Sequence, residues 1–338
     1  MHKKTESENK NNVALELTVK KLESKIDSLE KTINTYQSRN QAMLWYLLSD
    51  YGGKSSLLDI QKRFWNNYPK AKGNMKTIQE GNLFLIKNMV SICEKVGATF
   101  WLHGGSLIGA IRHQGFIPWD DDVDVGMLRE DLNKLITYLE TDPSFYIMEA
   151  YHDDHTFSRG YQFKSKDENF CCFIDIFPFD YYPFDPNSFD EAYSTERRLL
   201  VKDYLQLATK PSPEYVSYHF SKINKQRDGK VLDLLNSHLS KMRYLEESDY
   251  VCYSIENYPF QYPLMKKTDL LPCLKIRFEG LVLNMPANFG LYLKGYGDFW
   301  QMPPDVDRAS HLDYYLPHIG YIEEFLKKER ENDEQSTD

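Results

Sequence analysis

The stretch WLHGGSLIGAIRHQGFIPWDDDVDVGM, residues 101–127, holds the pattern that decides the fold. A short apolar run reaches the turn Gly104-Gly105-Ser106, and LIGAIR follows it as a helix would. Glycines between a strand and a helix let backbone N–H groups approach an anion, which the positive end of the helix also attracts. We therefore predict that Gly104, Gly105 and Ser106 bind an anion such as a phosphate, with Ser106 as the helix N-cap. A plain Gly-Gly turn is the alternative.

An acidic run follows the predicted helix. Asp120, Asp121, Asp122 and Asp124 crowd together, and two valines alternate with the last of them, which predicts a strand. Residues two apart on a strand share one face, so Asp120, Asp122 and Asp124 are expected to point the same way. Like charges this close repel unless a cation or a proton neutralises them. The run therefore predicts a site for Mg²⁺ or Mn²⁺, hard ions that prefer oxygen ligands.

Two other interpretations of the acidic run are weaker. A solvated acidic turn would not have Ile117 and Trp119 as its neighbours. A calcium-binding loop that begins at Asp120 would need glycine at its sixth position and glutamate at its twelfth, where this chain has Val125 and Asp131.

A second apolar strand is predicted in CCFIDIFPFD, residues 171–180, and Asp175 is the acid within its apolar part. A carboxylate between Ile174 and Ile176 needs a partner. The shared metal site is the most economical partner, and hydrogen bonding to backbone N–H groups at a strand end is the alternative.

The N-terminal region has a different pattern. Residues 13–48 carry a heptad repeat with Leu, Tyr or Met at d and mostly β-branched residues or Leu at a. This pattern predicts a parallel two-stranded coiled coil, in which Asn40 at an a position sets the register. A lone amphipathic helix packed on its own domain is the alternative. The d positions are Leu15, Leu22, Leu29, Tyr36 and Met43, and the a positions are Val19, Ile26, Ile33, Asn40 and Leu47.

Composition limits the classes of protein that the chain could represent. With 41 Lys and Arg against 50 Asp and Glu, the net charge of −9 argues against a nucleic-acid binder. No run approaches the ~18 apolar residues of a membrane span, and the polar start is not a secretory signal. The 5 cysteines include no CxxC pair, which favours a reduced protein. We expect a cytoplasmic location, with docking at the inner face of the membrane left open.

The whole pattern predicts an α+β fold. The expected organisation is a disordered start (1–12), a coiled coil (13–48), a linker with a short helix (49–74), a first part of a catalytic core (75–186), a helical insertion or lid (187–250), a second part of that core (251–325) and a charged tail (326–338).

Three motifs resemble the LicD family of phosphotransferases, and fukutin-related ribitol-phosphate transferases share them. They are HGGSLIGAIRHQGFIPWDDDVDV, FIDIFPFD and IRFEGLVLNMPANFGLYLKGYGDFWQMPP. The resemblance covers roughly residues 75–320 and excludes the predicted coil. It implies a nucleotidyltransferase-like fold, a mixed sheet flanked by helices. It also implies that Asp122, Asp124 and Asp175 are the catalytic, metal-binding acids, and it leaves Asp120 as either a ligand or a supporting acid.

The reaction that the resemblance implies is transfer of an alcohol phosphate, such as phosphocholine, ribitol phosphate or glycerol phosphate. The donor would be CDP-linked, the acceptor a hydroxyl of a cell-surface glycan in capsule, lipopolysaccharide or teichoic acid, and CMP would be released. Mg²⁺ would neutralise the charge of the transition state, and Asp175 is the candidate base. A glycosyltransferase, a true nucleotidyltransferase and a non-catalytic coiled-coil scaffold are the alternatives.

Several further residues are candidates for substrate binding. Arg112, Lys164 and Lys166 could contact donor phosphates, although surface lysines commonly have no such role. His311 could contact a phosphate or act as a base. The aromatic residues near the C-terminus could form a cage for a quaternary ammonium, although core packing is the commoner use. Those aromatic candidates are Tyr292, Tyr296, Phe299 and Trp300.

Overall fold

A computed structural model describes residues 55–152, 158–207, 225–242, 247–257, 262–301 and 311–335, with separate positions between 22 and 48. The chain divides into two compact units. The smaller comprises Met1–Trp65 and Trp300–Val306, and the larger comprises Asn66–Phe299 and Asp307–Asp338. The larger unit contains the acidic run and Asp175, so the description of the site concerns that unit.

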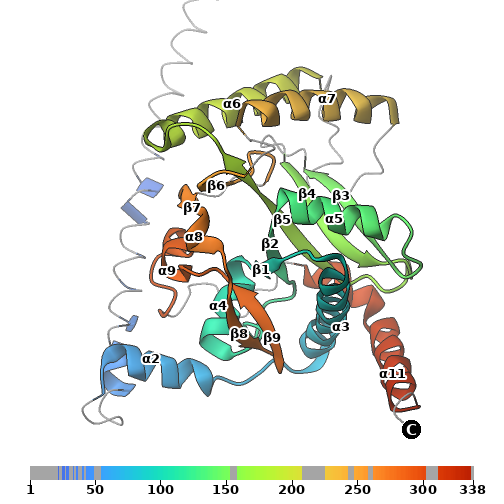
Figure 1. Cartoon of the computed structure of the whole chain (residues 1–338). Coiled ribbons are helices and arrows are strands. Elements are labelled where there is room, and N and C mark those ends of the chain that lie inside the picture. The colour runs from blue at the N-terminus through green and yellow to red at the C-terminus, as the bar shows by residue number, and fades with distance from the viewer. Residues whose placement is uncertain are drawn as a thin grey trace, which may run out of the picture. The chain divides into compact units, whose positions relative to one another are not determined.

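A mixed sheet forms the centre of the larger unit (Figure 1). Its strand order is β1-β2-β5-β4-β3, and β6 pairs with both β5 and β7. β2 and β5 are parallel, and the other neighbours are antiparallel. The strands are β1 (Phe100–Leu102), β2 (Asp124–Leu128), β3 (Phe145–His152), β4 (Ser158–Ser165), β5 (Phe173–Tyr182), β6 (Tyr250–Tyr253) and β7 (Met265–Lys266).

Helices flank this sheet. α3 (Gly73–Val96) and α5 (Arg129–Leu139) contact its strands, and α11 (Ile319–Gln335) packs on α3. α3 ends at Val96, because Gly97 after it adopts the left-handed conformation at φ 65°. The fold class is therefore α+β with a mixed sheet flanked by helices, as predicted.

A hairpin supports the elements that carry the glycine turn. β8 (Leu274–Phe278) pairs with β9 (Leu281–Met285). Phe278 packs against Phe116, which follows α4 (Gly104–His113), with ring centroids 4.8 Å apart. Asn284 donates a hydrogen bond of 2.8 Å to the backbone oxygen of Phe100 in β1. The hairpin thus holds both β1 and α4. The remaining short elements of this region are α8 (Lys267–Leu270), α9 (Phe289–Tyr292), η3 (Lys294–Tyr296), α10 (Leu312–Tyr315) and η4 (Leu316–His318).

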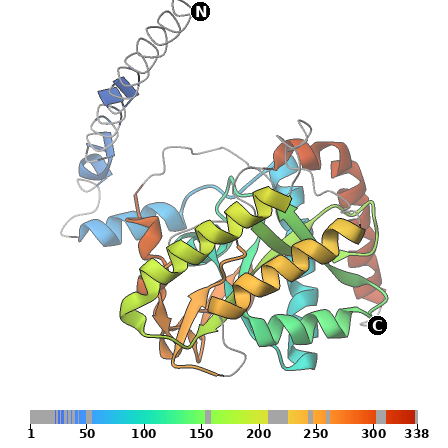
Figure 2. The same ribbon diagram turned by 90° about the horizontal axis from the view of Figure 1, so that it is seen from above.

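The segment expected as a helical insertion contains η1 (Pro186–Ser188), α6 (Phe189–Leu207) and α7 (Lys225–Met242). α6 and α7 lie side by side (Figure 2). They form a second small core with Tyr182, the last residue of β5, and with Cys252 of β6. Tyr182 follows Asp175 by seven residues on the same strand, about 23 Å for an extended chain, so these helices pack at the end of β5 away from Asp175.

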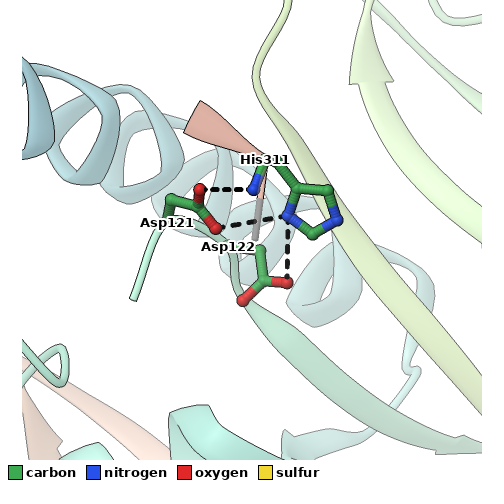
Figure 3. Close-up of side chains that lie close together, drawn as sticks. All are labelled: Asp121, Asp122 and His311. Atoms are coloured by element: carbon green, nitrogen blue, oxygen red, sulfur yellow. Dashed lines mark hydrogen bonds and ion pairs between the residues drawn. The ribbon is translucent and has the colours of Figure 1, made fainter. Parts of the chain in front are cut away.

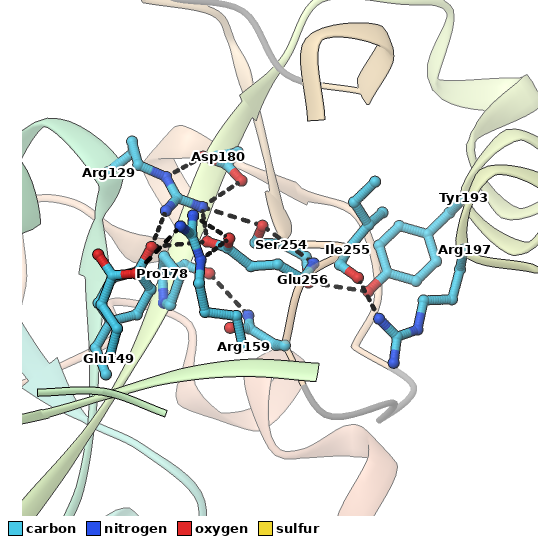
Figure 4. A network of polar contacts seen from close by, with 12 residues as sticks. Arg129, Glu149, Arg159, Pro178, Asp180, Tyr193, Arg197, Ser254, Ile255 and Glu256 are labelled. Atoms are coloured by element: carbon cyan, nitrogen blue, oxygen red, sulfur yellow. Dashed lines mark hydrogen bonds and ion pairs between the residues drawn. The ribbon is translucent and has the colours of Figure 1, made fainter. Parts of the chain in front are cut away.

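A buried ionic network joins this insertion to the sheet (Figure 4). Arg129 binds Asp180 with its Nε 2.9 Å from Oδ1, and it also contacts Glu256. Arg159 donates to Glu256 over 2.7 Å. From α6, Arg197 donates to the backbone oxygen of Ile255 over 2.6 Å. Because Glu256 is fully buried, its charge depends on both arginines.

Other expectations have mixed outcomes. The described positions between 22 and 48 are helical, and the expected disordered start lies outside the described residues. α2 (Leu57–Asn66) is the expected short helix within the linker. The segment expected as a charged tail, from residue 326, continues α11 as far as Gln335. Leu326 is buried, and Lys328 pairs with Glu324 one turn away, so this segment is held as a helix. Among the described helices, none has the length and apolarity to cross a bilayer.

Candidate functional site: a half-buried acidic cluster

Asp122, Asp124 and Asp175 form the centre of the site. Asp124 begins β2 and stands in register with Asp175 on the parallel strand β5. The N–H of Asp175 donates to the backbone oxygen of Val123 over 2.9 Å, which extends the pairing by one residue. One carboxylate oxygen from each of the three acids lies within 4.8 Å of the others. The structure therefore brings together the three acids that the sequence predicts as catalytic.

The predicted strand is shorter than expected. β2 begins only at Asp124, and the residues before it have no regular structure. The reason is that α3 takes their backbone groups. Gln79 donates to the backbone oxygen of Asp120 over 2.8 Å, and Asn82 donates to that of Asp121 over 2.9 Å. Alternation on a strand therefore does not explain the position of Asp120. Its carboxyl instead lies within hydrogen-bonding reach of Asp122.

The glycine turn lies against these acids. A Cβ on Gly104, which has φ 48°, would stand 3.0 Å from Oδ2 of Asp124. A Cβ on Gly105 would stand 2.9 Å from Oδ2 of Asp120. The two glycines therefore allow carboxylates to approach the start of α4, where the N–H groups are oriented for anions.

The predicted N-cap role of Ser106 is wrong. His103 occupies the N-cap position, and Ser106 is the third residue of α4. Its hydroxyl instead accepts the backbone N–H of Asp124 over 2.9 Å. Ser106 therefore joins the first turn of α4 to the start of β2. This hydrogen bond orients the Ser106 hydroxyl. Binding of a phosphate by the turn remains a prediction.

The cluster is electrostatically unfavourable without a counter-charge. Burial and the charge of Asp122 raise the pKa of Asp175 to about 7. Burial and neighbouring carboxylates also raise the pKa values of Asp120 and Asp124 well above their usual range. An all-oxygen donor set of this charge suits Mg²⁺ or Mn²⁺, which would relieve the repulsion. The residues present therefore fit such an ion.

Asp121, to which the sequence pattern assigns no role, joins the cluster through His311 (Figure 3). Asp121 is fully buried and accepts the backbone N–H of His311 over 2.7 Å. Nδ1 of the His311 ring lies 3.2 Å from Oδ1 of Asp121 and 3.7 Å from Oδ2 of Asp122. The sequence contains one sign of this role, because Asp121 alternates with Asp120 and Asp122 and is expected to face the opposite side, toward the core. A buried acid in that position requires a hydrogen-bond donor.

The predicted phosphate-binding cations differ in position. Arg112 is buried, and its Nη1 donates to the backbone oxygen of Phe299 over 2.7 Å. Burial lowers the pKa of Arg112 to about 10, and the charge of Asp120 acts in the opposite direction. Lys164 is half-buried on β4, and burial lowers its pKa while Asp175 raises it. Arg112 and Lys164 thus lie in the field of the cluster. Lys166 follows the end of β4, where its ammonium donates to the backbone oxygen of Asp142.

The aromatic candidates also separate. The Tyr296 hydroxyl lies 3.0 Å from the position that a Cβ on Gly104 would take, so it borders the site. Tyr292 is fully buried in the core. Trp300 belongs to the smaller unit, where Trp65 donates to its backbone oxygen over 2.8 Å. The buried position of Tyr292 therefore removes it from the expected cage.

The geometry of the acidic cluster and the glycine turn indicates a class of protein. An Asp-x-Asp pair at the start of one strand, a third Asp on its parallel neighbour and a Gly-Gly turn at the head of a helix define a nucleotidyltransferase-like site. Residues 97–206 match the family model LicD/FKTN/FKRP, nucleotidyltransferase domain. These residues therefore form a LicD-family domain, in agreement with the motifs.

Curated relatives agree with this assignment. Lipopolysaccharide cholinephosphotransferase LicD of Haemophilus influenzae is 26% identical over 241 residues, which cover 65% of this chain and 89% of that protein. Ribitol 5-phosphate transferase FKRP of Homo sapiens is 52% identical over 44 residues, which cover 13% of this chain and 9% of that protein. An uncharacterized protein of Rickettsia typhi, RT0683, is 34% identical over 87 residues, 25% of this chain and 26% of its own length.

Proposed function

We propose that this protein is a metal-dependent phosphotransferase. It moves an alcohol phosphate, such as phosphocholine, ribitol phosphate or glycerol phosphate, from a CDP-activated donor to a hydroxyl of a cell-surface glycan and releases CMP. The observation that carries the proposal is the convergence of Asp122, Asp124 and Asp175 within 4.8 Å. The names of the two transferase relatives support the class of reaction.

Asp122, Asp124 and Asp175 would hold the cation. When bound, Mg²⁺ or Mn²⁺ neutralises charge on the diphosphate and on the oxygens of the transferred phosphoryl group. Asp120 would orient Asp122, because its carboxyl lies within hydrogen-bonding reach of Asp122 in the cluster. A role of Asp120 as a further ligand is compatible with the same position.

The start of α4 would receive the donor phosphates. Its free N–H groups and the positive end of the helix attract an anion. Gly104 and Gly105 bear no side chains that would block this approach, and Arg112 and Lys164 lie in the field of the same acids. These groups would orient the donor so that the acceptor hydroxyl attacks in line.

Two residues are candidates for taking the acceptor proton. Asp175 belongs to the cluster, and its Oδ1 accepts a hydrogen bond of 2.9 Å from Gln162, which fixes the carboxylate. His311 is held by Asp121, whose two oxygens contact its backbone N–H and its Nδ1. This arrangement, a ring oriented by a buried carboxylate, is the geometry that general bases use.

A panel of donors tests the proposal. The purified protein is incubated with Mg²⁺, a glycan acceptor and one of the following donors: CDP-choline, CDP-ribitol, CDP-glycerol, a UDP-sugar or a nucleoside triphosphate. CMP release that requires the acceptor supports the proposal. UDP release would indicate a glycosyltransferase, pyrophosphate release from a nucleoside triphosphate would indicate a nucleotidyltransferase, and binding without turnover would indicate a scaffold. Asp122→Asn and Asp124→Asn should abolish CMP release, whereas Asp249→Asn, at an exposed position, should not.

We also propose that the N-terminal region forms a parallel homodimer. The described apolar a and d side chains are 54–62% exposed within one chain. An apolar stripe of this length requires a partner, and a heptad spacing fits a second copy of the same helix. The residues concerned are Leu22, Ile26, Leu29, Ile33, Tyr36, Met43 and Leu47.

A further inference from the structure

An aromatic side chain faces solvent beside the acidic cluster. Tyr314 belongs to α10, whose N-cap residue is His311, and the Tyr314 N–H donates to the backbone oxygen of His311 over 2.9 Å. The neighbouring Tyr315 is fully buried, whereas Tyr314 is 41% exposed. One short helix therefore connects a candidate base of the cluster to an open aromatic ring. Single exposed rings are common on proteins, so exposure by itself does not indicate a binding site.

Phe173 connects this ring to the acidic cluster. It lies two residues before Asp175 on β5, so both side chains project from the same face of the strand. The ring centroid of Phe173 lies 5.7 Å from that of His311 and 6.2 Å from that of Tyr314. Tyr315 stacks on Phe173 with centroids 6.0 Å apart, which anchors α10 on the sheet. The Tyr314 ring is thus linked through Phe173 to both candidates for taking the acceptor proton, Asp175 and His311.

Two further contacts fix the orientation of the Tyr314 ring. Its hydroxyl donates to the backbone oxygen of Cys171 over 3.4 Å. The ammonium of Lys164 lies 5.5 Å from the centroid of the Phe173 ring and 6.0 Å from that of the Tyr314 ring, within the range of a cation–π contact. A ring that is already held in place loses little conformational freedom when a ligand stacks on it. Tyr314 therefore presents a preformed contact surface.

The geometry of phosphoryl transfer identifies the substrate that would meet this ring. The attacking and leaving oxygens lie roughly in line, on opposite sides of the transferred group. The acceptor hydroxyl must lie beside the residue that takes its proton, and the candidates are Asp175 and His311. The leaving nucleotide is therefore on the other side, away from Tyr314. A quaternary ammonium of the donor is also disfavoured here, because the ammonium of Lys164 already lies over the ring and like charges repel.

We propose that the exposed ring of Tyr314 is the stacking surface for a pyranose ring of the acceptor glycan, and that it places a sugar hydroxyl beside Asp175 and His311. The inference rests on the proposed function, because it assigns the acceptor of that reaction. The C–H groups on one face of a pyranose are weakly positive, and the face of an aromatic ring is negative, so the two faces attract each other. A tyrosine also supplies a large, rigid contact area at a low cost in conformational entropy.

Binding of simple sugars tests the stacking surface directly. Saturation-transfer difference NMR is recorded with the methyl glycosides of glucose, galactose, N-acetylglucosamine and N-acetylgalactosamine. At least one of them should show saturation of the protons on one face of its ring. Tyr314→Ala should remove this signal, and Tyr314→Phe, which keeps the ring, should retain it. Tyr321→Ala is the matched control, because Tyr321 is 38% exposed, and it should retain the signal.

Several results of these spectra would overturn the inference. They are the absence of a signal from every glycoside with the wild type, a signal that persists in Tyr314→Ala, and an equal loss in Tyr314→Phe. Binding of choline that depends on Tyr314 would assign the ring to the donor and would overturn the inference as well. Because Tyr314 is exposed, its truncation should leave the circular dichroism spectrum unchanged.

Kinetics separate this inference from the proposed reaction. With a donor and a glycan that support CMP release, Tyr314→Ala should raise the KM for the glycan roughly 2–10-fold, as loss of an aromatic contact does. The effect on kcat should be smaller, and the KM for the donor should be unchanged. An unchanged KM for the glycan would overturn the inference. If the wild type releases no CMP from any donor, the proposed reaction fails, and the glycoside spectra still decide whether Tyr314 binds a sugar.

Discussion

Asp124 and Asp175 are direct partners across the parallel pair of β2 and β5, so their side chains project from the same face of the sheet. Two acids on separate strands become neighbours only through this register. A slip of one residue would turn one of them to the opposite face. The register is held at the site itself, because the Asp124 N–H is bound by Ser106 and the Asp175 N–H by the backbone of Val123.

Asp175→Asn tests the shared site. Removing one charged oxygen ligand should weaken Mg²⁺ binding by at least roughly 10–100-fold, the range found even for residues behind metal ligands. Isothermal titration calorimetry measures the affinity, and CMP release should fall in parallel. Asp249→Asn, the control, removes the same charge at an exposed position and should bind Mg²⁺ as the wild type does. Unchanged Mg²⁺ affinity in Asp175→Asn would exclude this residue as a ligand.

The stability of the metal-free protein should fall as the pH rises. The pKa of Asp175 is raised from 3.8 to about 7, so the folded state binds more protons than the unfolded chain between these values. The stabilisation that this provides is present at low pH and is lost as the pH rises through about 7. Mg²⁺ binds the deprotonated acids, so the increase in Tm that it causes should grow from pH 5.5 to 7.5. Thermal unfolding with EDTA or Mg²⁺ measures both effects, and Asp175→Asn should reduce them. An increase in Tm that is independent of pH would contradict the electrostatic account.

Glu256→Gln tests the buried ionic network. Its loss of charge leaves Arg129 and Arg159 incompletely paired, and breaking a buried ion pair costs about 3–5 kcal/mol. Denaturant unfolding measures the free energy of unfolding. Glu149→Gln is the control, because Glu149 is 42% exposed and its contact with Arg159 is 3.5 Å long, so a cost below ~1 kcal/mol is expected. Equal costs for the two variants would show that burial does not matter here.

Gly104→Ala should impair the site more than the fold. The residue has φ 48°, where an L side chain costs roughly 1–2 kcal/mol, and the new Cβ would press on Asp124 and Tyr296 at 3.0 Å. CMP release should fall at least about tenfold while the circular dichroism spectrum is unchanged, since bound geometry governs such rates. Gly290→Ala lies within α9 and has nothing within 4 Å of the new Cβ, so it should keep full activity.

The proposed homodimer can be tested by cross-linking. In a parallel in-register coil, two copies of the d residue Leu29 face each other, so Leu29→Cys should form an intermolecular disulfide under mild oxidation. The neighbouring Ser28→Cys, outside the seam, should not. Removal of residues 1–48 should give a monomer by light scattering with CMP release retained. A truncated protein that remains dimeric would place the dimer interface elsewhere.

The local parts of the site were readable in the sequence because short-range patterns determine them. The Gly104-Gly105 turn before an apolar helix, the acidic run, and Asp175 within an apolar strand each predicted an element that the structure contains or a residue that it places in the cluster. The limits of local patterns also appear here. Alternation predicted a strand from Asp120, but Gln79 and Asn82 hold that backbone, so the strand begins later.

The sequence by itself determined which residues are candidates for the chemistry, since composition and spacing within a few residues are sufficient to single out acids, glycines and strands. The tertiary structure alone decided which of them meet. Asp121 contacts His311 across 190 positions of sequence, and Trp101 reaches Tyr292 across 191. Such contacts depend on how the whole core packs. Residues that meet through packing follow no periodic pattern in the sequence, so the sequence does not predict which of them are partners.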